Sequence, residues 1–217
     1  GPHNVRDKSG WTLRSGSVYT GGSPYNTENQ GNMKSDDGKV WVGGLALKIE
    51  PSGKNLQVVA HNFRNAYELA IDSRGDMWQN DNDDQVVACR TTWLMEGGNA
   101  GYFSADGTRS WQADQRPWQE VFTAHWHQDD PGVMPAGDNA GAGSPTGVVV
   151  YEGDALGEQY RGMLLSADAG RNVIFAYHPD KSGSGYDLGK RINFITSLQE
   201  DNVGYVWNDS ADNAQPD

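Results

Sequence analysis

The densest set of oxygen-bearing side chains lies in the stretch WQNDNDDQVV, residues 78–87. Asn and Asp fill every position from 80 to 84, between two apolar runs. Carboxylate and amide oxygens are the hard donors that Ca²⁺ prefers. The stretch nevertheless fails the EF-hand pattern, because Gln85 and Val86 stand where that pattern needs an Asp or Asn and a glycine. Two hypotheses stay open: a cation site, or a polar turn whose side chains bind their own backbone.

A second candidate site lies in TAHWHQDDPGVMPAGDN, residues 123–139. His125 and His127 would share one face of an extended segment, and Asp129 and Asp130 follow directly. Such a cluster is typical of half of a zinc or other transition-metal site, or of an acid/base pair. The competing interpretation is a loop edge whose imidazoles hydrogen-bond to the backbone.

Tryptophans fall into two sets with different expectations. Trp41 and Trp78 follow hairpin glycines, and we expect them to be core residues. Trp111, Trp118 and Trp126 lie in a region without strand pattern. If exposed, these three could stack on sugar rings; otherwise they form a small local core.

The charge balance limits the partners. The chain carries 29 acidic and 17 basic residues, a net charge of −12. We expect neither nucleic acid nor an anionic membrane as partner, since both require a basic surface. No apolar stretch approaches the about 18 residues of a membrane-spanning helix. Cys89, the one cysteine, lies in the apolar run VVACR and is predicted to be a core residue rather than a nucleophile.

A recurring turn motif predicts a β protein. A small polar residue opens each turn, and a glycine in the left-handed conformation returns the chain to a strand. The motif occupies residues 7–13, 35–41, 50–59, 72–78 and 104–111. Short β-branched or aromatic runs predict strands at 43–49, 67–72, 86–94, 146–153, 162–168, 172–178 and 191–198. No helix is expected beyond a turn near 154–160.

A faint internal repeat predicts how the strands are organised. Residues 77–89 and 163–177 each run from an apolar strand through a polar link to a second apolar strand. Repeated four-stranded modules are typical of a β-propeller, with a β-sandwich as the competing fold. We expect residues 1–217 to form one partial propeller domain, with a long ordered insertion at 97–145 and a polar tail at 208–217.

The order and spacing of four motifs carry a resemblance to a known family. The motifs are FRNAYELAIDSRGDMWQNDND (63–83), MEGGNAGYFSADG (95–107), GAGSPTGVVVYEGD (141–154) and RGMLLSADAGRNVIFAYHP (161–179). The chain resembles the propeller dehydrogenases of soluble glucose/sorbosone type, which use pyrroloquinoline quinone (PQQ). It is most similar to the membrane-bound dehydrogenase propellers of planctomycete-type bacteria.

The resemblance implies an activity and its partners. We expect a calcium-dependent dehydrogenase of a sugar or alcohol, periplasmic or secreted, that passes electrons to a c-type cytochrome domain or protein. The family has six blades, whereas about four fit in this chain at roughly 40–50 residues each. Further chain, or a partner polypeptide, would complete the ring.

The resemblance also assigns roles to residues. Arg64 and Asn65 would hold the quinone, because a guanidinium pairs well with carboxylates. Arg171 would assist from the later motif. The Ca²⁺ ligands would come from the acidic link, partly through backbone carbonyls, at Asp81, Asn82 and Asp83.

The chain departs from the family at several points, two of which concern the residues of the expected site. Ala66 replaces the proline of the family's RNP motif, and no histidine stands where the family has its general base. His125 and His127 are then the available candidates for that base. The alternative hypothesis is a non-catalytic propeller module that binds carbohydrate or protein, whose acidic link is structural or binds only Ca²⁺.

Overall fold

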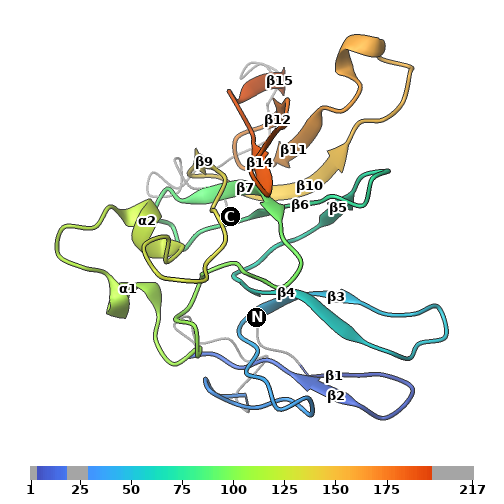
Figure 1. Cartoon of the computed structure of the whole chain (residues 1–217). Helices are drawn as coiled ribbons and strands as arrows, with labels where there is room; N and C mark the ends of the chain where they lie inside the picture. Colours follow the sequence, from blue (N-terminus) through green and yellow to red (C-terminus); the bar gives the residue numbers. More distant parts are fainter. Residues whose placement is uncertain (1–3, 19–28, 197–217) are drawn as a thin grey trace. The chain divides into compact units, whose positions relative to one another are not determined.

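The structure, a computed structural model, describes residues 4–18 and 29–196. The chain forms two compact units (Figure 1). The first unit contains residues 1–65 and 95–135, and the second contains residues 66–94 and 136–217. The single domain predicted over residues 1–217 stays a prediction, and the tail at 208–217 lies outside the described residues.

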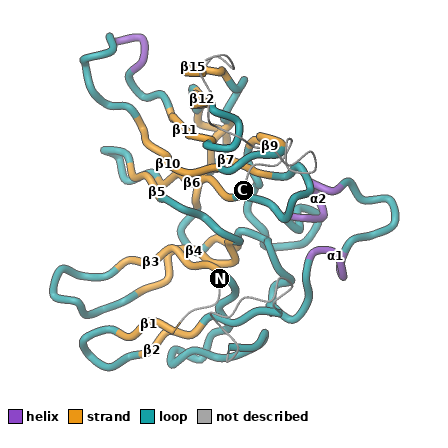
Figure 2. The backbone as a smooth tube through the Cα atoms, turned by 180° about the vertical axis from the view of Figure 1, so that it is seen from behind, coloured by secondary structure: helices purple, strands orange, loops and turns teal. Residues whose placement is uncertain are grey.

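The first unit pairs short sheets with a long loop region. β1 (Asn4–Arg6) and β2 (Thr12–Arg14) form a hairpin. β3 (Gly44–Lys48) and β4 (Gln57–Phe63) are antiparallel, and β8 (Gly98–Asn99) adds to β4 in parallel. Loop then dominates this unit, interrupted by the short helices α1 (Trp111–Asp114) and α2 (Val121–His125) (Figure 2).

The second unit consists of two four-stranded antiparallel sheets and a hairpin. One sheet has the order β5 (Leu69–Ile71), β6 (Met77–Asp81), β7 (Cys89–Leu94), β9 (Asp138–Gly141). The other has the order β10 (Pro145–Val150), β11 (Leu164–Asp168), β12 (Val173–Tyr177), β15 (Ile192–Thr196). The 3₁₀ turn η1 (Glu158–Tyr160) precedes β11, and the hairpin of β13 (Asp180–Ser182) and β14 (Gly185–Asp187) precedes β15.

The core of the second unit lies between its two sheets. Trp78 of β6 packs with Leu164 of β11, Phe175 of β12 and further buried apolar side chains of both sheets. Tyr186 of β14 covers the Trp78 ring at 4.7 Å between centroids. The expectation that Trp78 is a core residue is confirmed, whereas Trp41 is only half-buried.

The predicted all-β class and its blade-like sheets are confirmed. The five predicted turns all form, with their glycines at positive φ, as at Gly53 (80°) and Gly75 (89°). The repeat is also confirmed, because the β6–β7 and β11–β12 hairpins form the middle of the two four-stranded sheets. No helix in the described part of the chain is long and apolar enough to cross a membrane.

The expectation of no helix beyond residues 154–160 was wrong. η1 confirms the predicted turn, but α1 and α2 lie in the predicted insertion. Each has only about one turn, too short to produce a helical hydrophobic period. α1 begins where the Ser110 side chain caps the helix by accepting from the Ala113 amide, a local signal that apolar periodicity does not reveal.

The core between the two sheets generates a stability prediction. We expect Leu164→Ala to lower the free energy of unfolding by about 2–5 kcal/mol, because it leaves a cavity at a fully buried position. The control is Val149→Ala on the neighbouring strand, where the side chain is half-exposed and the cost should stay under about 1 kcal/mol. Urea unfolding of both variants measures the difference, and equal costs would contradict the proposed core.

Candidate functional site

In the first unit, Asn62 joins the two motifs HNFRN and GGNAGYF. The Asn62 side-chain amide donates to Asn99 Oδ1 and to the Phe103 carbonyl, both at 2.8 Å. Its Oδ1 accepts from the Phe103 amide at 2.9 Å. The backbone of Asn62 also bonds to Val42 and Tyr102. The buried Asn62 side chain and the backbone bonds of β4 together fix the end of this strand to residues 99–103.

Arg64 lies two residues beyond this junction. Its guanidinium carbon is 6.0 Å from the centroid of the Tyr102 ring, within the range of a cation–π contact. Arg64 is half-buried, and Asn65 beside it is exposed. The structure thus holds the half-buried arginine of one motif against the aromatic ring of the other.

The Tyr102 ring belongs to an aromatic cluster in the predicted insertion. His125 lies 5.4 Å from Tyr102, 5.2 Å from Trp111 and 4.4 Å from Trp126, measured between ring centroids. The three tryptophans of this region were expected either to be exposed or to form a small local core. Trp111 and Trp126 form such a core, at 5% and 0% exposed, whereas Trp118 is 76% exposed. We call the five packed rings the aromatic cluster: Tyr102, Phe103, Trp111, His125 and Trp126.

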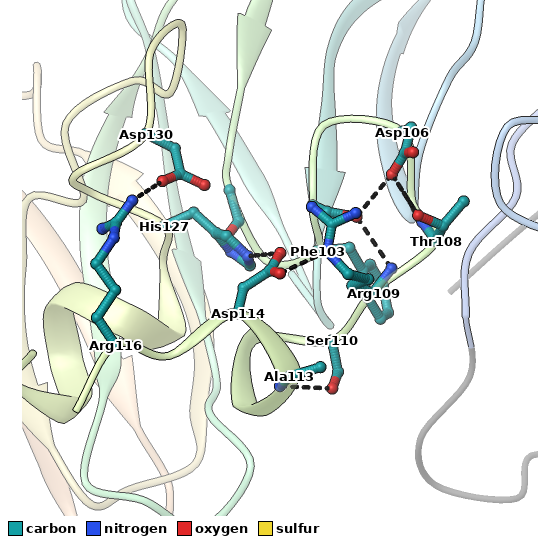
Figure 3. Close-up of polar contacts among 12 residues, drawn as sticks. Phe103, Asp106, Thr108, Arg109, Ser110, Ala113, Asp114, Arg116, His127 and Asp130 are labelled. Carbon is teal, nitrogen blue, oxygen red and sulfur yellow. Dashed lines mark hydrogen bonds and ion pairs between the residues drawn. The ribbon is translucent and has the colours of Figure 1, made fainter.

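Both ring nitrogens of His127 lie close to an oxygen atom, and Figure 3 shows the contact with Asp114. Nδ1 lies 2.6 Å from the Gly101 carbonyl, so this nitrogen carries a proton and donates. Nε2 lies 3.3 Å from Asp114 Oδ2, and the Arg109 guanidinium pairs with the same carboxylate at 2.5 Å. His127 also has a positive φ of 47°. The imidazole therefore fixes the loop after α2 to α1 and to residue 101.

The two histidines do not form a shared site for a metal. His125 ends α2 inside the aromatic cluster, whereas His127 follows the helix in a left-handed turn and faces Asp114. The extended segment that would place both rings on one face does not form. A general base must reach the proton it removes, and both imidazoles are buried.

In the second unit, the acidic link joins β6 to β7. Asp83 is buried and caps the link: its Oδ1 accepts from the Gln85 amide at 2.9 Å, and its Oδ2 accepts from the Ala88 amide. Gln85 and Val87 both have positive φ, at 65° and 61°. A β-branched residue rarely adopts this conformation, so the bonds to Asp83 offset local strain.

Asp81 faces Arg90 across the β6–β7 ladder. The two residues are register partners, and Arg90 Nη2 lies 3.8 Å from Asp81 Oδ2. Both side chains are fully buried. Burial lowers the pKa of Arg90 to about 10, and the nearby Asp81 charge opposes that shift. The pair is an internal ion pair of the sheet.

Arg171 lies in the equivalent link between β11 and β12. Its guanidinium donates to the Ala140 carbonyl and lies 5.4 Å from the centroid of the Phe175 ring. Its amide donates to Asp168 Oδ1 at 3.1 Å. Burial raises the pKa of Asp168, while its bonds from the Ser144 and Arg171 amides lower it. The Arg171 side chain thus links β9 to β12 by contacting a residue of each strand.

Cys89 is a core residue, as expected. Its thiol donates to the Gly143 carbonyl at 3.4 Å, and burial raises its pKa to about 12. A thiol with so high a pKa is almost entirely protonated near neutral pH, which excludes a thiolate nucleophile at this position.

The two groups implied by the resemblance fit the described residues unequally. Arg64 suits an anionic planar cofactor, because it offers a guanidinium beside an aromatic face. The carboxylates of Asp81 and Asp83 do not suit Ca²⁺ in this arrangement, because a buried arginine and two backbone amides already engage them. Within residues 4–18 and 29–196, no group of three or more His, Cys, Asp or Glu side chains is placed to hold a metal ion.

The structural roles of Asn62 and Arg90 were not predicted from the sequence. Asn62 stands directly before the FRN motif, and a polar residue in an apolar strand was the available signal. Arg90 sits in the predicted strand 86–94, where a charge among apolar neighbours similarly indicates a buried partner. In both cases the apolar residues on either side indicate that the polar side chain is buried and must have a partner.

The bonds made by Asp83 predict its effect on stability. We expect Asp83→Ala to lower the free energy of unfolding by about 1–3 kcal/mol, because the amides of Gln85 and Ala88 lose their acceptor. The control Asp154→Ala removes an exposed ion pair and should cost less than about 1 kcal/mol. Urea unfolding should give the same Asp83→Ala penalty with and without Ca²⁺. A penalty that grows with Ca²⁺ would show a metal-binding carboxylate instead.

His61 of β4 generates a pH prediction. Burial lowers its pKa from 6.5 to about 4, and its Nδ1 accepts from the Val42 amide at 3.3 Å. The unfolded chain takes up this proton below about pH 6.5 while the folded chain does not. The resulting stability is present above that pH and is lost as the pH falls towards 4, by up to about 2–3 kcal/mol.

The variant His61→Gln isolates this contribution from that of the carboxylates. We expect its free energy of unfolding to fall less steeply than that of the wild type between pH 6.5 and 4. Chemical denaturation at several pH values measures both slopes. Parallel slopes would mean that His61 titrates alike in the folded and unfolded chains.

Among solved structures, the PQQ-bound aldose sugar dehydrogenase from Streptomyces coelicolor matches 90% of this chain and 48% of that one, at 14% identity and a TM-score of 0.46. The apo soluble aldose sugar dehydrogenase from Escherichia coli matches 88% and 53%, at 15% identity and a TM-score of 0.45. The chain spans about half of the length of these proteins.

The expected likeness to propellers of planctomycete-type bacteria is tested by none of these matches and stays a prediction. No curated protein sequence matches the chain. A family model described as "Domain of unknown function (DUF7133)" matches residues 14–203. Because this match covers well over half of the 217 residues, the chain belongs to the DUF7133 family.

Proposed function

We propose that the chain is part of a quinoprotein-like oxidoreductase that acts on a sugar or alcohol. One observation carries the proposal: Asn62 brings together the two motifs of the first unit that resemble the PQQ dehydrogenases. The same junction places Arg64 against the Tyr102 ring. An arrangement that keeps a guanidinium beside an aromatic face, with solvent access, suits a planar anionic ligand.

Arg64 and Asn65 are the proposed cofactor contacts. The guanidinium of Arg64 would pair with a carboxylate of the quinone, and the exposed amide of Asn65 could donate or accept beside it. A bound quinone would supply the acceptor for the hydride of the substrate carbinol. No role is proposed for Ca²⁺ through Asp81 or Asp83, and neither buried histidine is assigned as the base.

The wider setting belongs to the same proposal. A dehydrogenase of this class would work outside the cytoplasm and pass its electrons to a cytochrome. Because the chain spans about half of the length of the solved structures that it matches, further blades would complete its ring. These blades would come from additional chain or from a partner polypeptide.

A second candidate is the non-catalytic module that binds carbohydrate or protein. This candidate is favoured by the charged side chains of the second unit, which bond to other groups of the same unit. Asp83 binds backbone amides, Asp81 faces Arg90, and Arg171 donates to a main-chain carbonyl. Such a set stabilises sheets and links whether or not a cofactor is ever bound.

Quinone binding separates the two candidates. We expect the chain to bind PQQ in titration calorimetry, and Arg64→Ala to weaken that binding at least about tenfold through the loss of a charge-assisted pair. Arg64→Lys should fall between the two, because a lysine keeps the charge but not the planar fork.

Arg161→Ala is the matched control, since it removes another arginine that is well exposed and paired with Asp154. Its PQQ affinity should equal that of the wild type. If the wild type binds no PQQ, with or without Ca²⁺, the result would contradict the quinoprotein proposal and support the non-catalytic module. Reduction of a redox dye in the presence of PQQ and a panel of sugars and alcohols then tests turnover.

A further inference from the structure

Trp118 is the most exposed tryptophan of the predicted insertion. It is 76% exposed, while Trp111 and Trp126 of the same segment are buried in the aromatic cluster. Leaving an indole in water forgoes a large burial energy, and large exposed aromatics are frequent at recognition sites. Its sequence neighbours Gln115, Arg116, Gln119 and Glu120 are all polar.

The turn that carries Trp118 is held by its own hydrogen bonds. The Gln119 amide donates to the Arg116 carbonyl at 3.0 Å, and the Arg116 amide donates to Gln119 Oε1 at 3.2 Å. Gln115 Nε2 donates to the Gln119 carbonyl at 3.2 Å. Pro117, directly before Trp118, further limits the backbone. A ring held on such a turn loses little conformational entropy when it binds a ligand.

The turn is also tied to the body of the first unit. Arg116 pairs with Asp130 at 2.8 Å and with Asp129 at 3.5 Å, and Asp130 follows the anchored His127 in the chain (Figure 3). Gln119 Nε2 donates to Asp129 at 2.9 Å. The exposed indole therefore stands on a braced surface loop, which we call the Trp118 turn (residues 115–119).

We propose that the Trp118 turn is a binding site for a neutral sugar ring. A pyranose presents one face of C–H groups, which an indole can cover, and a rim of hydroxyls, which amide and carboxylate side chains can bond. Gln115 and Gln119 lie in the same turn as Trp118, and Gln119 bonds to Asp129, so these three side chains supply such donors and acceptors.

The local charge favours a neutral sugar over an acidic one. The single positive charge of Arg116 is balanced by Asp129 and Asp130, and Glu120 follows the turn. The whole chain carries a net charge of −12, which repels polyanions. A protein partner is less favoured, because protein interfaces have an apolar centre and the only other large apolar side chain exposed near this turn, among the described residues, is Val121.

This inference does not depend on the proposed oxidoreductase function. The binding is therefore measured without PQQ, by titration calorimetry and indole fluorescence with glucose, mannose and xylose as monosaccharides and as linked hexaoses. Binding to insoluble cellulose distinguishes a polymer from a free sugar as the natural ligand. We expect at least one neutral saccharide to bind, and Trp118→Ala to weaken its binding at least about tenfold.

Two variants separate ring stacking from general apolar contact. Trp118→Tyr should retain binding within about threefold, because it keeps an aromatic face, whereas Trp118→Leu should lose it as fully as Trp118→Ala does. Tyr67→Ala, which removes another highly exposed ring, should bind as the wild type does. Because Trp118 is exposed, the variants should unfold at the wild-type temperature.

Three outcomes would overturn the proposal. One is that the wild type binds none of the saccharides, and another is that Trp118→Ala binds as well as the wild type. The third is full saccharide binding by Trp118→Leu, which would show that the contact with the sugar does not need an aromatic face. Failure of PQQ binding would leave this proposal standing, and failure of saccharide binding would leave the quinone proposal standing.

Discussion

The arrangement of the first unit around Arg64 depends on the side chain of Asn62, whose donors and acceptor all have hydrogen-bond partners. Its amide donates both hydrogens, and its oxygen accepts one, with every partner in residues 99–103. The residue also has a φ of 67°, a conformation that Asn tolerates better than most residues. No other side chain combines this backbone preference with the same donors and acceptor. A substitution would leave buried polar groups without partners, each at a cost of about 1–3 kcal/mol.

The long loop of the first unit, within residues 95–135, is likewise held by the hydrogen bonds and packing of buried side chains. Asn62 fixes its start, the aromatic cluster fills its centre, and His127 ties its later part to Gly101 and Asp114. With so little regular structure, side-chain bonds replace backbone ladders. The two functional proposals rest on Arg64, which is half-buried at the edge of β4, and on Trp118, which is exposed on its braced turn.

The sequence predicted the features that depend on local rules. Glycine turns, short β-branched strands and the repeated hairpin follow from backbone preference and period, and all appear in the described chain. The role of Asp83 was open between cation and turn, because both use the same oxygens. Only the positions of the Gln85 and Ala88 amides show the turn.

Features that depend on distant contacts could not be predicted. The exposures of Trp111, Trp118 and Trp126 differ because of what the rest of the loop places around them. The pairing of Asp81 with Arg90 depends on the register of β6 and β7. Helices of a single turn likewise owe their existence to caps and tertiary packing rather than to periodicity.

The central claim is that Asn62 fixes residues 99–103 and so the surroundings of Arg64. Native-state hydrogen exchange of the Phe103 amide, compared between the wild type and Asn62→Ala, tests it most directly. The account predicts that this amide loses at least about tenfold in protection, since its acceptor is Asn62 Oδ1, while amides of β12 in the second unit change little. Unchanged protection at Phe103 would contradict it.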